Sequence, residues 1–463
     1  MKKLFGTDGM RGEAGVFPLD AATVRAAGRS LARHLGDELG RAPLLVTGRD
    51  TRESGTWIER DFIEGILSAG GQAASAGVIT TPGVAFLARD MPADAGVVIS
   101  ASHNPFHDNG IKIFSPTGRK LDDATERLIE ADIYAERESG APPPDFDEGA
   151  TPPDEDDQAG YMRSASALRA GYLRHLADGV AAGLRLEGLS VVLDCANGAA
   201  SELAPALFLR LGARVVSTFD TPDGRNINRD CGSLHTDLLC RRVVEEGAHL
   251  GVAYDGDADR ALFVDARGRL VDGDATLWVL AKRMQERGEL VGGRVVATVM
   301  SNIGLEVALR SRGVELLRTD VGDKYVLEEL LRTGSSLGGE QSGHIIFPRL
   351  SLAGDGMLTT INLLRAVVES ARPLDELTEG FRRYPQVLLN VRVREKVPFE
   401  EVEEIADAAR EVRERLGDGG RLLLRYSGTE PLARVMIEGQ SQEEIDALAE
   451  GLAGVIRRRL AEG

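Results

Sequence analysis

Short apolar runs alternate with amphipathic stretches over about the first 370 residues of the chain. The runs at 43–47, 96–100 and 190–194 have the length and the apolar content of buried strands. The amphipathic stretch after Asp20 predicts a helix to about His34, with Asp20 as its cap. Repeated alternation of strand and helix predicts sheets with helices on both faces. Ligands of such folds bind at the carboxyl ends of strands, so polar motifs at those ends carry the most weight.

The last 85 residues or so follow a different pattern. Residues 387–393 alternate between apolar and polar side chains, as an antiparallel strand with one buried face does. A helix at about 398–416, strands at 422–425 and 433–438, and a terminal helix predict a small α+β unit. Between residues 140 and 160, five prolines and seven acidic residues, without Lys or Arg, predict a solvated linker or surface loop.

The composition of the chain excludes several functional classes of protein. Of 463 residues, 73 are acidic and 55 are Lys or Arg, and this net charge of −18 disfavours nonspecific binding to nucleic acid or to an anionic membrane. No apolar run approaches the roughly 18 residues of a membrane span, and Gly6 and Asp8 come too early for a secretory signal, so we expect a cytoplasmic protein. Three cysteines without paired spacing predict neither a disulfide scaffold nor a zinc site.

A serine loop follows the apolar run at 96–100. Small residues, Asn-Pro and Asn-Gly within Ser100–Pro105 and Asp108–Lys112 favour tight turns that would expose the hydroxyl of Ser102. A serine nucleophile needs a base or a metal beside it, and His103, Lys112 or a cation would serve. The alternative is an ordinary turn that carries a surface histidine.

Three alternating aspartates follow the apolar run at 250–254. Asp255, Asp257 and Asp259 can direct hard oxygen ligands at one divalent cation, preferably Mg²⁺. Arg260 adds a planar fork for a phosphate. The alternative is a solvated acidic turn, although three carboxylates this close repel one another without a cation.

A third loop, Gly338–His344, is rich in glycine and has the donors and acceptors of a sugar site. Glu340 and Ser342, two positions apart, can bind vicinal sugar hydroxyls from one side of an extended loop. His344 can donate or accept a proton near neutral pH. A glycine-rich turn with a surface histidine is the alternative.

A fourth loop, Arg425–Pro431, is suited to a phosphate monoester. Its arginine, its hydroxyls and the backbone amides beside a glycine can form an anion nest, and Arg434 follows closely. The alternative is a plain connection between two strands. Arg11, which lies between glycines near the start of the chain, also suits the approach of a phosphate but fits a plain loop equally well.

The serine, aspartate, sugar and phosphate loops, in this order, resemble those of the α-D-phosphohexomutase superfamily. The resemblance extends from Phe5 to Met436, and Ala258 is a mild departure where many members have glycine. Within the superfamily, the segments 5–12 and 338–344, above all Gln341, are most similar to members that act on glucosamine phosphates. The resemblance implies four domains around a central cleft. On this sequence we expect three α/β domains with mixed sheets at 1–158, 159–260 and 261–374, and an α+β phosphate-binding domain at 375–463.

The same resemblance implies a mechanism. Ser102 would be carried as phosphoserine, and one Mg²⁺ would be held by the three aspartates and an oxygen of that phosphate. Arg11, Lys112 and Arg260 would offset developing negative charge, with His344 or Lys112 as the acid/base. The substrate would be held by residues of the third and fourth loops, namely Glu340, Ser342, Arg425, Ser427, Gly428, Thr429 and Arg434.

The function implied is the interconversion of glucosamine 6-phosphate and glucosamine 1-phosphate, which supplies UDP-N-acetylglucosamine synthesis. A sugar 1,6-bisphosphate would be both intermediate and activator. The chain would act on a small hexosamine phosphate, and a homodimer is compatible with this role. Three alternatives stay open: a mutase of glucose or mannose phosphates with the same chemistry, a metal-dependent sugar phosphatase, and a catalytically silent sugar-phosphate binder.

Overall fold

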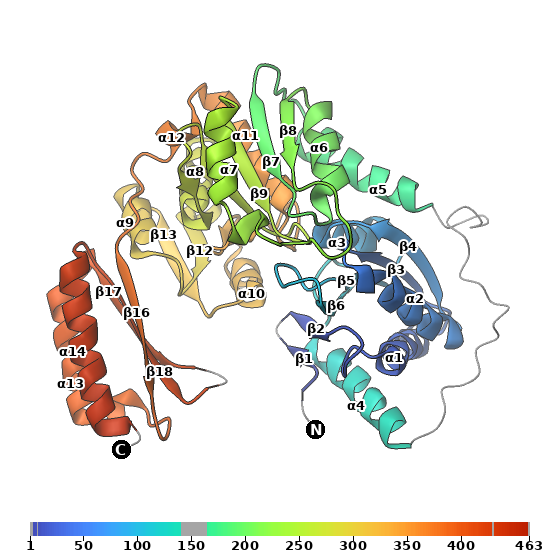
Figure 1. The fold of residues 1–463 in the computed structure, drawn as a ribbon, viewed down its shortest axis with the longest axis horizontal. Coiled ribbons are helices and arrows are strands. Elements are labelled where there is room, and N and C mark those ends of the chain that lie inside the picture. Colours follow the sequence, from blue (N-terminus) through green and yellow to red (C-terminus); the bar gives the residue numbers. More distant parts are fainter. Residues whose placement is uncertain (1–2, 7, 140–163, 428–429, 462–463) are drawn as a thin grey trace.

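The computed structural model describes residues 3–6, 8–139, 164–427 and 430–461. In these parts of the chain the strands form sheets of six, five, four and three strands, which follow one another along the sequence. Figure 1 shows the four units arranged as an arch, with the first and the last unit at its two ends. The expected fold class, three α/β units and a C-terminal α+β unit, is confirmed. The linker expected at 140–160 lies outside the described residues.

The first unit is built on a mixed sheet with the strand order β1-β2-β6-β5-β3-β4. Its strands are β1 (Phe5–Gly6), β2 (Gly9–Glu13), β3 (Leu44–Arg49), β4 (Gln72–Val78), β5 (Ala95–Ile99) and β6 (Asp108–Phe114). Its helices are α1 (Ala21–Leu39), α2 (Glu53–Ser68), α3 (Thr81–Asp90) and α4 (Asp123–Ser139). The carboxylate of Asp20 caps α1, as expected, because it accepts a hydrogen bond from the backbone N–H of Thr23. Strand β3 runs parallel to β5, so the loops that follow these two strands meet at one edge of the sheet.

The second unit has a five-stranded sheet in the order β11-β10-β9-β7-β8. Its strands are β7 (Ser190–Asp194), β8 (Arg214–Thr218), β9 (Leu250–Tyr254), β10 (Ala261–Asp265) and β11 (Leu270–Val271). Its helices are α5 (Ala165–Arg174), the π-helix η1 (His175–Val180), α6 (Ala200–Arg210), the short 3₁₀-helix η2 (Gly232–Leu234) and α7 (Asp237–Glu245). Strands β9 and β10 pair as an antiparallel hairpin, with Tyr254 opposite Ala261. The boundary expected at residue 260 therefore falls inside this hairpin, because the sharp turn between two strands of one sheet resembles a break in the sequence pattern.

The third unit has a smaller sheet in the order β13-β12-β14-β15. Its strands are β12 (Arg294–Thr298), β13 (Glu315–Thr319), β14 (Gly338–Gly339) and β15 (Ile345–Ile346). Its helices are α8 (Gly273–Glu286), η3 (Val291–Gly293), α9 (Ile303–Ser311), α10 (Asp323–Thr333), α11 (Gly356–Ser370) and α12 (Leu374–Leu377). The antiparallel pair β14–β15 holds the glycine-rich loop between its strands.

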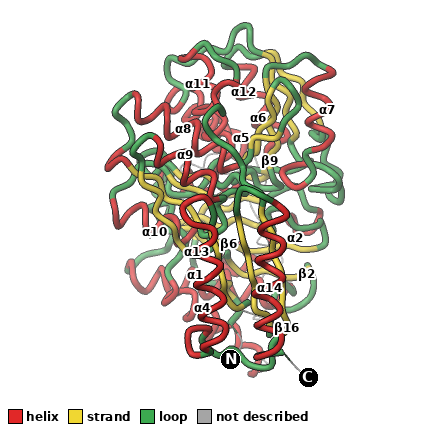
Figure 2. The backbone as a smooth tube through the Cα atoms, turned by 90° about the vertical axis from the view of Figure 1, so that its left-hand side faces the viewer, coloured by secondary structure: helices red, strands yellow, loops and turns green. Residues whose placement is uncertain are grey.

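The fourth unit is an antiparallel sheet in the order β16-β18-β17 that packs against two helices. Its elements are β16 (Gln386–Arg392), η4 (Phe399–Glu401), α13 (Glu403–Leu416), η5 (Gly417–Gly419), β17 (Arg421–Tyr426), β18 (Leu432–Glu438) and α14 (Gln442–Leu460). Figure 2, which views this end of the molecule, shows α13 and α14 lying side by side.

The buried apolar side chains divide the molecule into a continuous body and an appended unit. One cluster runs through the first three units, from Val46 through Val191 to Ile361. The fourth unit has a cluster of its own, which includes Val435 and Ile445. Burial of apolar area therefore holds the first three units together, while the fourth unit joins them through polar contacts described below. Among the described residues, no helix is both long and apolar enough to cross a membrane.

Candidate active site

The turn after β5 presents Ser102 in a sparsely populated backbone conformation. Its φ is +52°, a region that residues other than glycine rarely adopt. The turn is held by hydrogen bonds in series: the backbone N–H of Ser102 donates to Ser100 Oγ (2.9 Å), and Ser100 Oγ donates to Asp50 Oδ2 (2.7 Å). The hydroxyl of Ser102 is buried and directed at the aspartate loop, where it donates to Asp255 Oδ2 at 2.6 Å.

A buried arginine fixes the rest of the serine loop. Arg52 is fully buried and forms an ion pair with Asp50, with Nε 2.9 Å from Oδ2. Its Nη2 donates to the carbonyl oxygens of Ser102 (2.9 Å) and Asn104 (2.8 Å), and the amide of Asn228 donates to the same two oxygens. Sequence reasoning missed these positioning residues. The available signal was that Asp50 and Arg52 follow β3, the parallel neighbour of β5.

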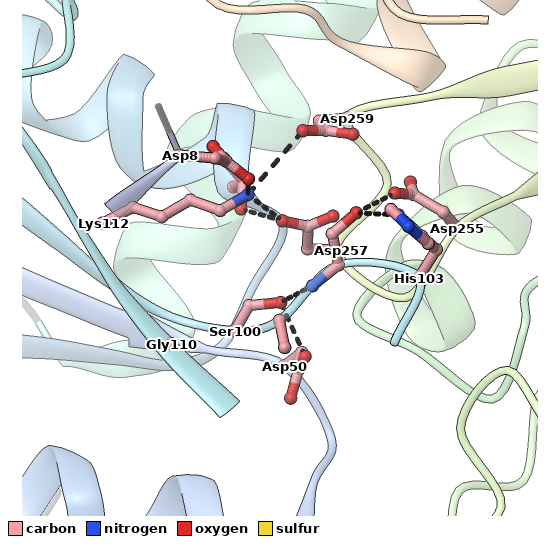
Figure 3. A network of polar contacts seen from close by, with 12 residues as sticks. Asp8, Asp50, Ser100, His103, Gly110, Lys112, Asp255, Asp257 and Asp259 are labelled. Carbon is pink, nitrogen blue, oxygen red and sulfur yellow. Dashed lines mark hydrogen bonds and ion pairs between the residues drawn. The ribbon is translucent and has the colours of Figure 1, made fainter. Parts of the chain in front are cut away.

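The three aspartates of the β9–β10 connection lie close together (Figure 3), and one of them, Asp255, accepts the hydrogen bond of the Ser102 hydroxyl. Asp255, Asp257 and Asp259 are all buried, and each offers an oxygen within 4.8 Å of the others. Burial and the two neighbouring carboxylates raise the pKa of Asp255 well above its usual range. Within the described structure, Asp257 Oδ1 and Asp259 Oδ1 are buried without a hydrogen-bond partner. Oxygen atoms left unpaired in this way fit a hard divalent cation, which would satisfy them and cancel the repulsion.

Lys112 extends from β6 into the same carboxylates. Its Nζ lies 2.9 Å from Asp257 Oδ2, 3.8 Å from Asp259 Oδ2 and 3.3 Å from Asp8 Oδ2. Figure 3 shows Lys112 facing all three carboxylates. Burial alone would lower the pKa of Lys112, but the carboxylates of Asp257, Asp8 and Asp259 outweigh it and raise the pKa above its ordinary value. Lys112 is therefore a cation at neutral pH. Thr81 also binds Asp257, with Oγ1 2.6 Å from Oδ2.

His103 and Arg260 form a second polar pair beside Ser102. Arg260 Nη1 lies 3.1 Å from His103 Nδ1, and because a guanidinium can only donate, Nδ1 is the acceptor. Burial lowers the pKa of His103, and the charges of Arg260 and Arg11 lower it further, so the ring is neutral near pH 7. Arg11 is paired with Asp8 and directs Nη1 to the carbonyl oxygen of Ala101 at 3.5 Å.

The glycine-rich loop lies against the start of β10. Ser342 Oγ donates to Glu340 Oε2 (3.2 Å), and Glu340 Oε1 accepts a hydrogen bond from the backbone N–H of Gly322 (3.2 Å). The backbone N–H of Ala261 donates to the carbonyl oxygen of Gly343. A side chain at Gly343 is excluded, because its φ is +92° and an added Cβ would lie 2.4 Å from the carbonyl oxygen of Ala261. The loop is thus fixed to the hairpin that carries the aspartates.

His344 brings this loop into the carboxylate cluster. It is buried, with Nδ1 3.5 Å from Asp259 Oδ2 and Nε2 3.9 Å from Asp323 Oδ2. Burial by itself would lower the pKa of His344, but Asp259, Asp323 and Glu340 together raise it to about 9. His344 and Lys112 are therefore two cations that both approach Asp259 Oδ2, contributed by the third and the first unit.

The phosphate loop lies in the fourth unit, between β17 and β18. Arg425 stands directly opposite Arg434 in the strand register, so both side chains are on one face of the sheet. Arg434 Nη2 donates to Ser427 Oγ at 3.4 Å. Gly428 and Thr429 lie outside the described residues. Among the residues that are described, the hydrogen bonds and ion pairs of Ser427 and Arg434 stay within the fourth unit.

The sequence-derived site residues thus divide into two groups. One network of direct contacts joins residues of the first three units: Ser102, His103, Arg11, Lys112, Asp255, Asp257, Asp259, Arg260 and His344. Glu340 and Ser342 adjoin this network through the charge of Glu340, which acts on both Arg260 and His344. The arginines of the phosphate loop form a separate cationic site at the end of the fourth unit.

Comparison with known proteins agrees with this architecture. Models of the phosphoglucomutase/phosphomannomutase family match residues 2–140 (alpha/beta/alpha domain I), 170–268 (domain II), 272–384 (domain III) and 388–455 (C-terminal domain). Among solved structures, a phosphoglucomutase/phosphomannomutase family protein from Burkholderia thailandensis shares the fold with a TM-score of 0.78 and 22% identity over 99% of both chains. An N-acetylphosphoglucosamine mutase from Aspergillus fumigatus, in complex with GlcNAc-6P and magnesium, has a TM-score of 0.64 and 19% identity over 98% of this chain and 95% of its own.

Relatives of known name are considerably closer in sequence. The phosphoglucosamine mutase of Solibacter usitatus is 48% identical over the full length of both chains. The phosphoglucosamine mutase of Syntrophotalea carbinolica is 46% identical over 99% of this chain and 98% of its own. Identity at this level over whole chains, together with four family domains in order, agrees with the resemblance noted in the sequence. The chain therefore belongs to the phosphoglucosamine mutase family of enzymes, within the α-D-phosphohexomutase superfamily.

Proposed function

We propose that this enzyme interconverts glucosamine 6-phosphate and glucosamine 1-phosphate through phosphorylated Ser102 and a bisphosphorylated sugar. The observation that carries the proposal is the 2.6 Å hydrogen bond from Ser102 Oγ to Asp255, within a buried group of three carboxylates. A serine hydroxyl on a strained turn has little structural use there, but its oxygen is well placed to carry a phosphoryl group beside a cation. The names of the full-length relatives support the choice of an amino sugar.

Mg²⁺ is the cation that this donor set fits. Asp255, Asp257 and Asp259 would hold it together with an oxygen of the phosphorylated Ser102. When bound, Mg²⁺ neutralises negative charge on the transferring phosphoryl group. The side chains around it would add to this effect, because Arg11, Lys112 and Arg260 are cations that surround the serine and aspartate loops.

The reaction consists of two half-reactions of opposite direction. In the first, the bond between phosphorus and Ser102 Oγ breaks, a bond from phosphorus to a sugar oxygen forms, and the proton of the sugar hydroxyl passes to a basic group. The bisphosphorylated sugar then turns around in the site. In the second half-reaction, Ser102 Oγ regains a phosphoryl group from the other end of the sugar, and the hydroxyl proton is returned.

Proton transfer in these steps falls to Lys112 or His344. Carboxylates hold both side chains as cations in the resting site. The one that acts would give its proton to Ser102 Oγ as that oxygen leaves phosphorus and would then take up the proton of the sugar hydroxyl, and the second half-reaction would reverse both transfers. Neutral His103, which accepts a hydrogen bond from Arg260 beside the Ser102 hydroxyl, would position the serine loop and can accept a proton. Glu340 and Ser342 would bind sugar hydroxyls.

The fourth unit would hold the phosphate that is not reacting. Arg425 and Arg434 are cations on one face of the sheet, which favours an anion between them, and Ser427 lies next to Arg434. Gly428 and Thr429 would complete the site. A substrate bound there and at Ser102 would link the fourth unit to the first. We further propose that the enzyme acts in the cytoplasm on this small molecule, and a homodimer is compatible with the proposal.

A comparison of three substrates tests the function. Turnover would be measured with the 6-phosphates of glucosamine, glucose and mannose, each with its 1,6-bisphosphate as activator. We expect a clear preference for glucosamine 6-phosphate, and a preference for glucose or mannose would overturn it. Release of free phosphate without isomerised sugar phosphate would instead identify a phosphatase. Intact mass should show about 80 Da of added mass on the peptide that contains Ser102, which a silent binding protein would lack.

A further inference from the structure

Lys120 joins the first and third units through a single ammonium group. It follows β6, and its Nζ lies 2.7 Å from Asp8 Oδ1 and 2.7 Å from Asp323 Oδ2. Asp8 lies between β1 and β2 of the first unit, whereas Asp323 is the first residue of α10 in the third. Burial alone would lower the pKa of Lys120, but Asp323 and Asp8 together raise it, so the bridge is charged at neutral pH.

Each of the two carboxylates that Lys120 joins also contacts one of the two candidate proton-transfer groups, Lys112 and His344. Asp8 also binds Lys112 (3.3 Å), and Asp323 lies 3.9 Å from His344 Nε2. Lys112 and His344 in turn both contact Asp259, at 3.8 Å and 3.5 Å. The result is a closed ring of alternating charges, in the order Lys112, Asp8, Lys120, Asp323, His344 and Asp259.

The space beside the ring explains why this bridge matters. A cavity of about 700 Å³ lies between the first and third units, and members of the ring form its polar wall. Apolar side chains, among them Phe114, Leu121 and Leu327, line the cavity as well. Apolar side chains of the two units line a cavity here instead of packing against each other, so the ring supplies the contact that sets the spacing of the units at this point.

A neighbouring ion pair provides a natural comparison. Lys324 Nζ lies 2.7 Å from Asp123 Oδ1 and also connects the third unit to the first. Both side chains are more exposed than Lys120 (37% and 47% against 23%), and Asp123 is no member of the ring. Exposed pairs of this kind contribute little to stability and fix little geometry.

We propose that Lys120 is a positioning residue for phosphoryl transfer: by holding Asp8 and Asp323 together, it sets the separation of Lys112 and His344. The inference rests on the proposed function, in which Lys112 or His344, contributed by different units, transfers the proton of the sugar hydroxyl beside the aspartates. Loss of the ammonium would leave two carboxylates facing each other across the cavity, and their repulsion would move Lys112 and His344 apart. Substrate would still bind, because Lys120 itself lies outside the loops that would hold the sugar.

The test compares kcat and KM for glucosamine 6-phosphate in four proteins: the wild type, Lys120→Met, Lys120→Arg and Asp123→Asn. We expect Lys120→Met to lower kcat by about 10- to 100-fold, with KM changed less than about threefold, the loss typical of a misplaced catalytic group. Lys120→Arg keeps the positive charge and has N–H donors for both carboxylates, so it should recover most of kcat. Asp123→Asn removes the neighbouring ion pair between the same units and should behave as wild type.

Several outcomes would overturn the inference. They are an unchanged kcat in Lys120→Met, an effect confined to KM, no recovery in Lys120→Arg, or an equal loss in Asp123→Asn. If Lys120→Met does not fold, Asp323→Asn removes the same bridge from the third unit and should show the same loss of kcat. Wild-type protein inactive on glucosamine 6-phosphate would contradict the proposed function instead, which keeps the two failures distinct.

Discussion

The side-chain amide of Gln341 donates a hydrogen bond to the buried carboxylate of Asp274, with Nε2 3.0 Å from Oδ2. Gln341 is the residue of the third loop that most resembles members of the superfamily acting on glucosamine phosphates, and its side chain is thus directed into the third unit. Asp274 Oδ2 also accepts the backbone N–H of Asn302 (2.8 Å), and the Asn302 amide donates to Glu438 of the fourth unit (3.1 Å). A continuous polar chain therefore connects the sugar loop with the junction that carries the fourth unit.

Removal of the Gln341 amide should destabilise the protein. In Gln341→Leu, the buried carboxylate of Asp274 loses one of its donors, and we expect the free energy of unfolding to fall by about 1 to 3 kcal/mol. Urea denaturation measures this difference. Gln442 is a suitable control, because its amide binds Asp446 on the exposed surface of α14, and Gln442→Leu should change stability by no more than about 0.5 kcal/mol. Equal effects of the two changes would contradict the anchoring role of Gln341.

Stability should depend on pH through Asp274. Burial and the nearby Asp272 raise the pKa of Asp274 from 3.8 to about 7. Since the folded state binds this proton more tightly, the contribution of Asp274 is fully present below about pH 4 and is lost as the pH rises to about 7, by at most about 4 kcal/mol. In Asp274→Asn this slope should disappear. Between pH 5 and pH 8, the free energy of unfolding of the variant should therefore rise relative to that of wild type. Parallel curves for the two proteins would refute the assignment.

Ser102→Ala should abolish turnover and phosphorylation while the fold persists. The hydroxyl is the only group removed, and its methylene stays in the buried turn. Turnover of glucosamine 6-phosphate, intact mass and circular dichroism together measure the outcome. Ser54→Ala serves as a control, because Ser54 is another buried serine whose hydroxyl accepts a bond from Asn109, away from the aspartates. Turnover at the wild-type rate in Ser102→Ala would exclude Ser102 as the phosphoryl carrier.

Mg²⁺ should stabilise the folded protein as well as support turnover. Cation binding to Asp255, Asp257 and Asp259 would cancel their repulsion, and at 100 times the dissociation constant it contributes about 2.7 kcal/mol. Chelation should abolish turnover, and added Mg²⁺ should restore it and raise the thermal midpoint. In Asp257→Asn with Asp259→Asn the rise in midpoint should vanish. A rise that persists in this double variant would place the cation elsewhere.

Arg425→Ala should mainly weaken substrate binding. A charge-assisted contact to a phosphate accounts for a few kcal/mol at most, so KM should rise by about 10- to 100-fold with a smaller change in kcat. Arg413→Ala, on the exposed face of α13 in the same unit, provides the matched control. A fall confined to kcat would contradict the role of Arg425 as a phosphate anchor.

Local features of this chain were predictable from sequence because each depends on a few neighbouring residues. The strand at 190–194 coincides with β7, since a short apolar run between turn residues has few other stable conformations. The turn chemistry around Ser102 and the alternation of Asp255, Asp257 and Asp259 likewise express constraints within six or seven residues. The family resemblance then supplied the order of the units.

Tertiary structure alone decided which of these features meet and in which charge state. Ser102 and Asp255 are 153 positions apart, Lys120 and Asp323 are 203 apart, and no periodicity encodes such pairs. Residue 260 lies inside a hairpin and not at the expected domain boundary, because β10 pairs with β9. This pairing depends on hydrogen bonds between strands, which the composition of the chain does not reveal. Neighbouring carboxylates then keep Lys112 and His344 protonated against the effect of burial, and both influences exist only in the folded chain. The sequence by itself determined the reactive groups, and the fold determined their distances and charges.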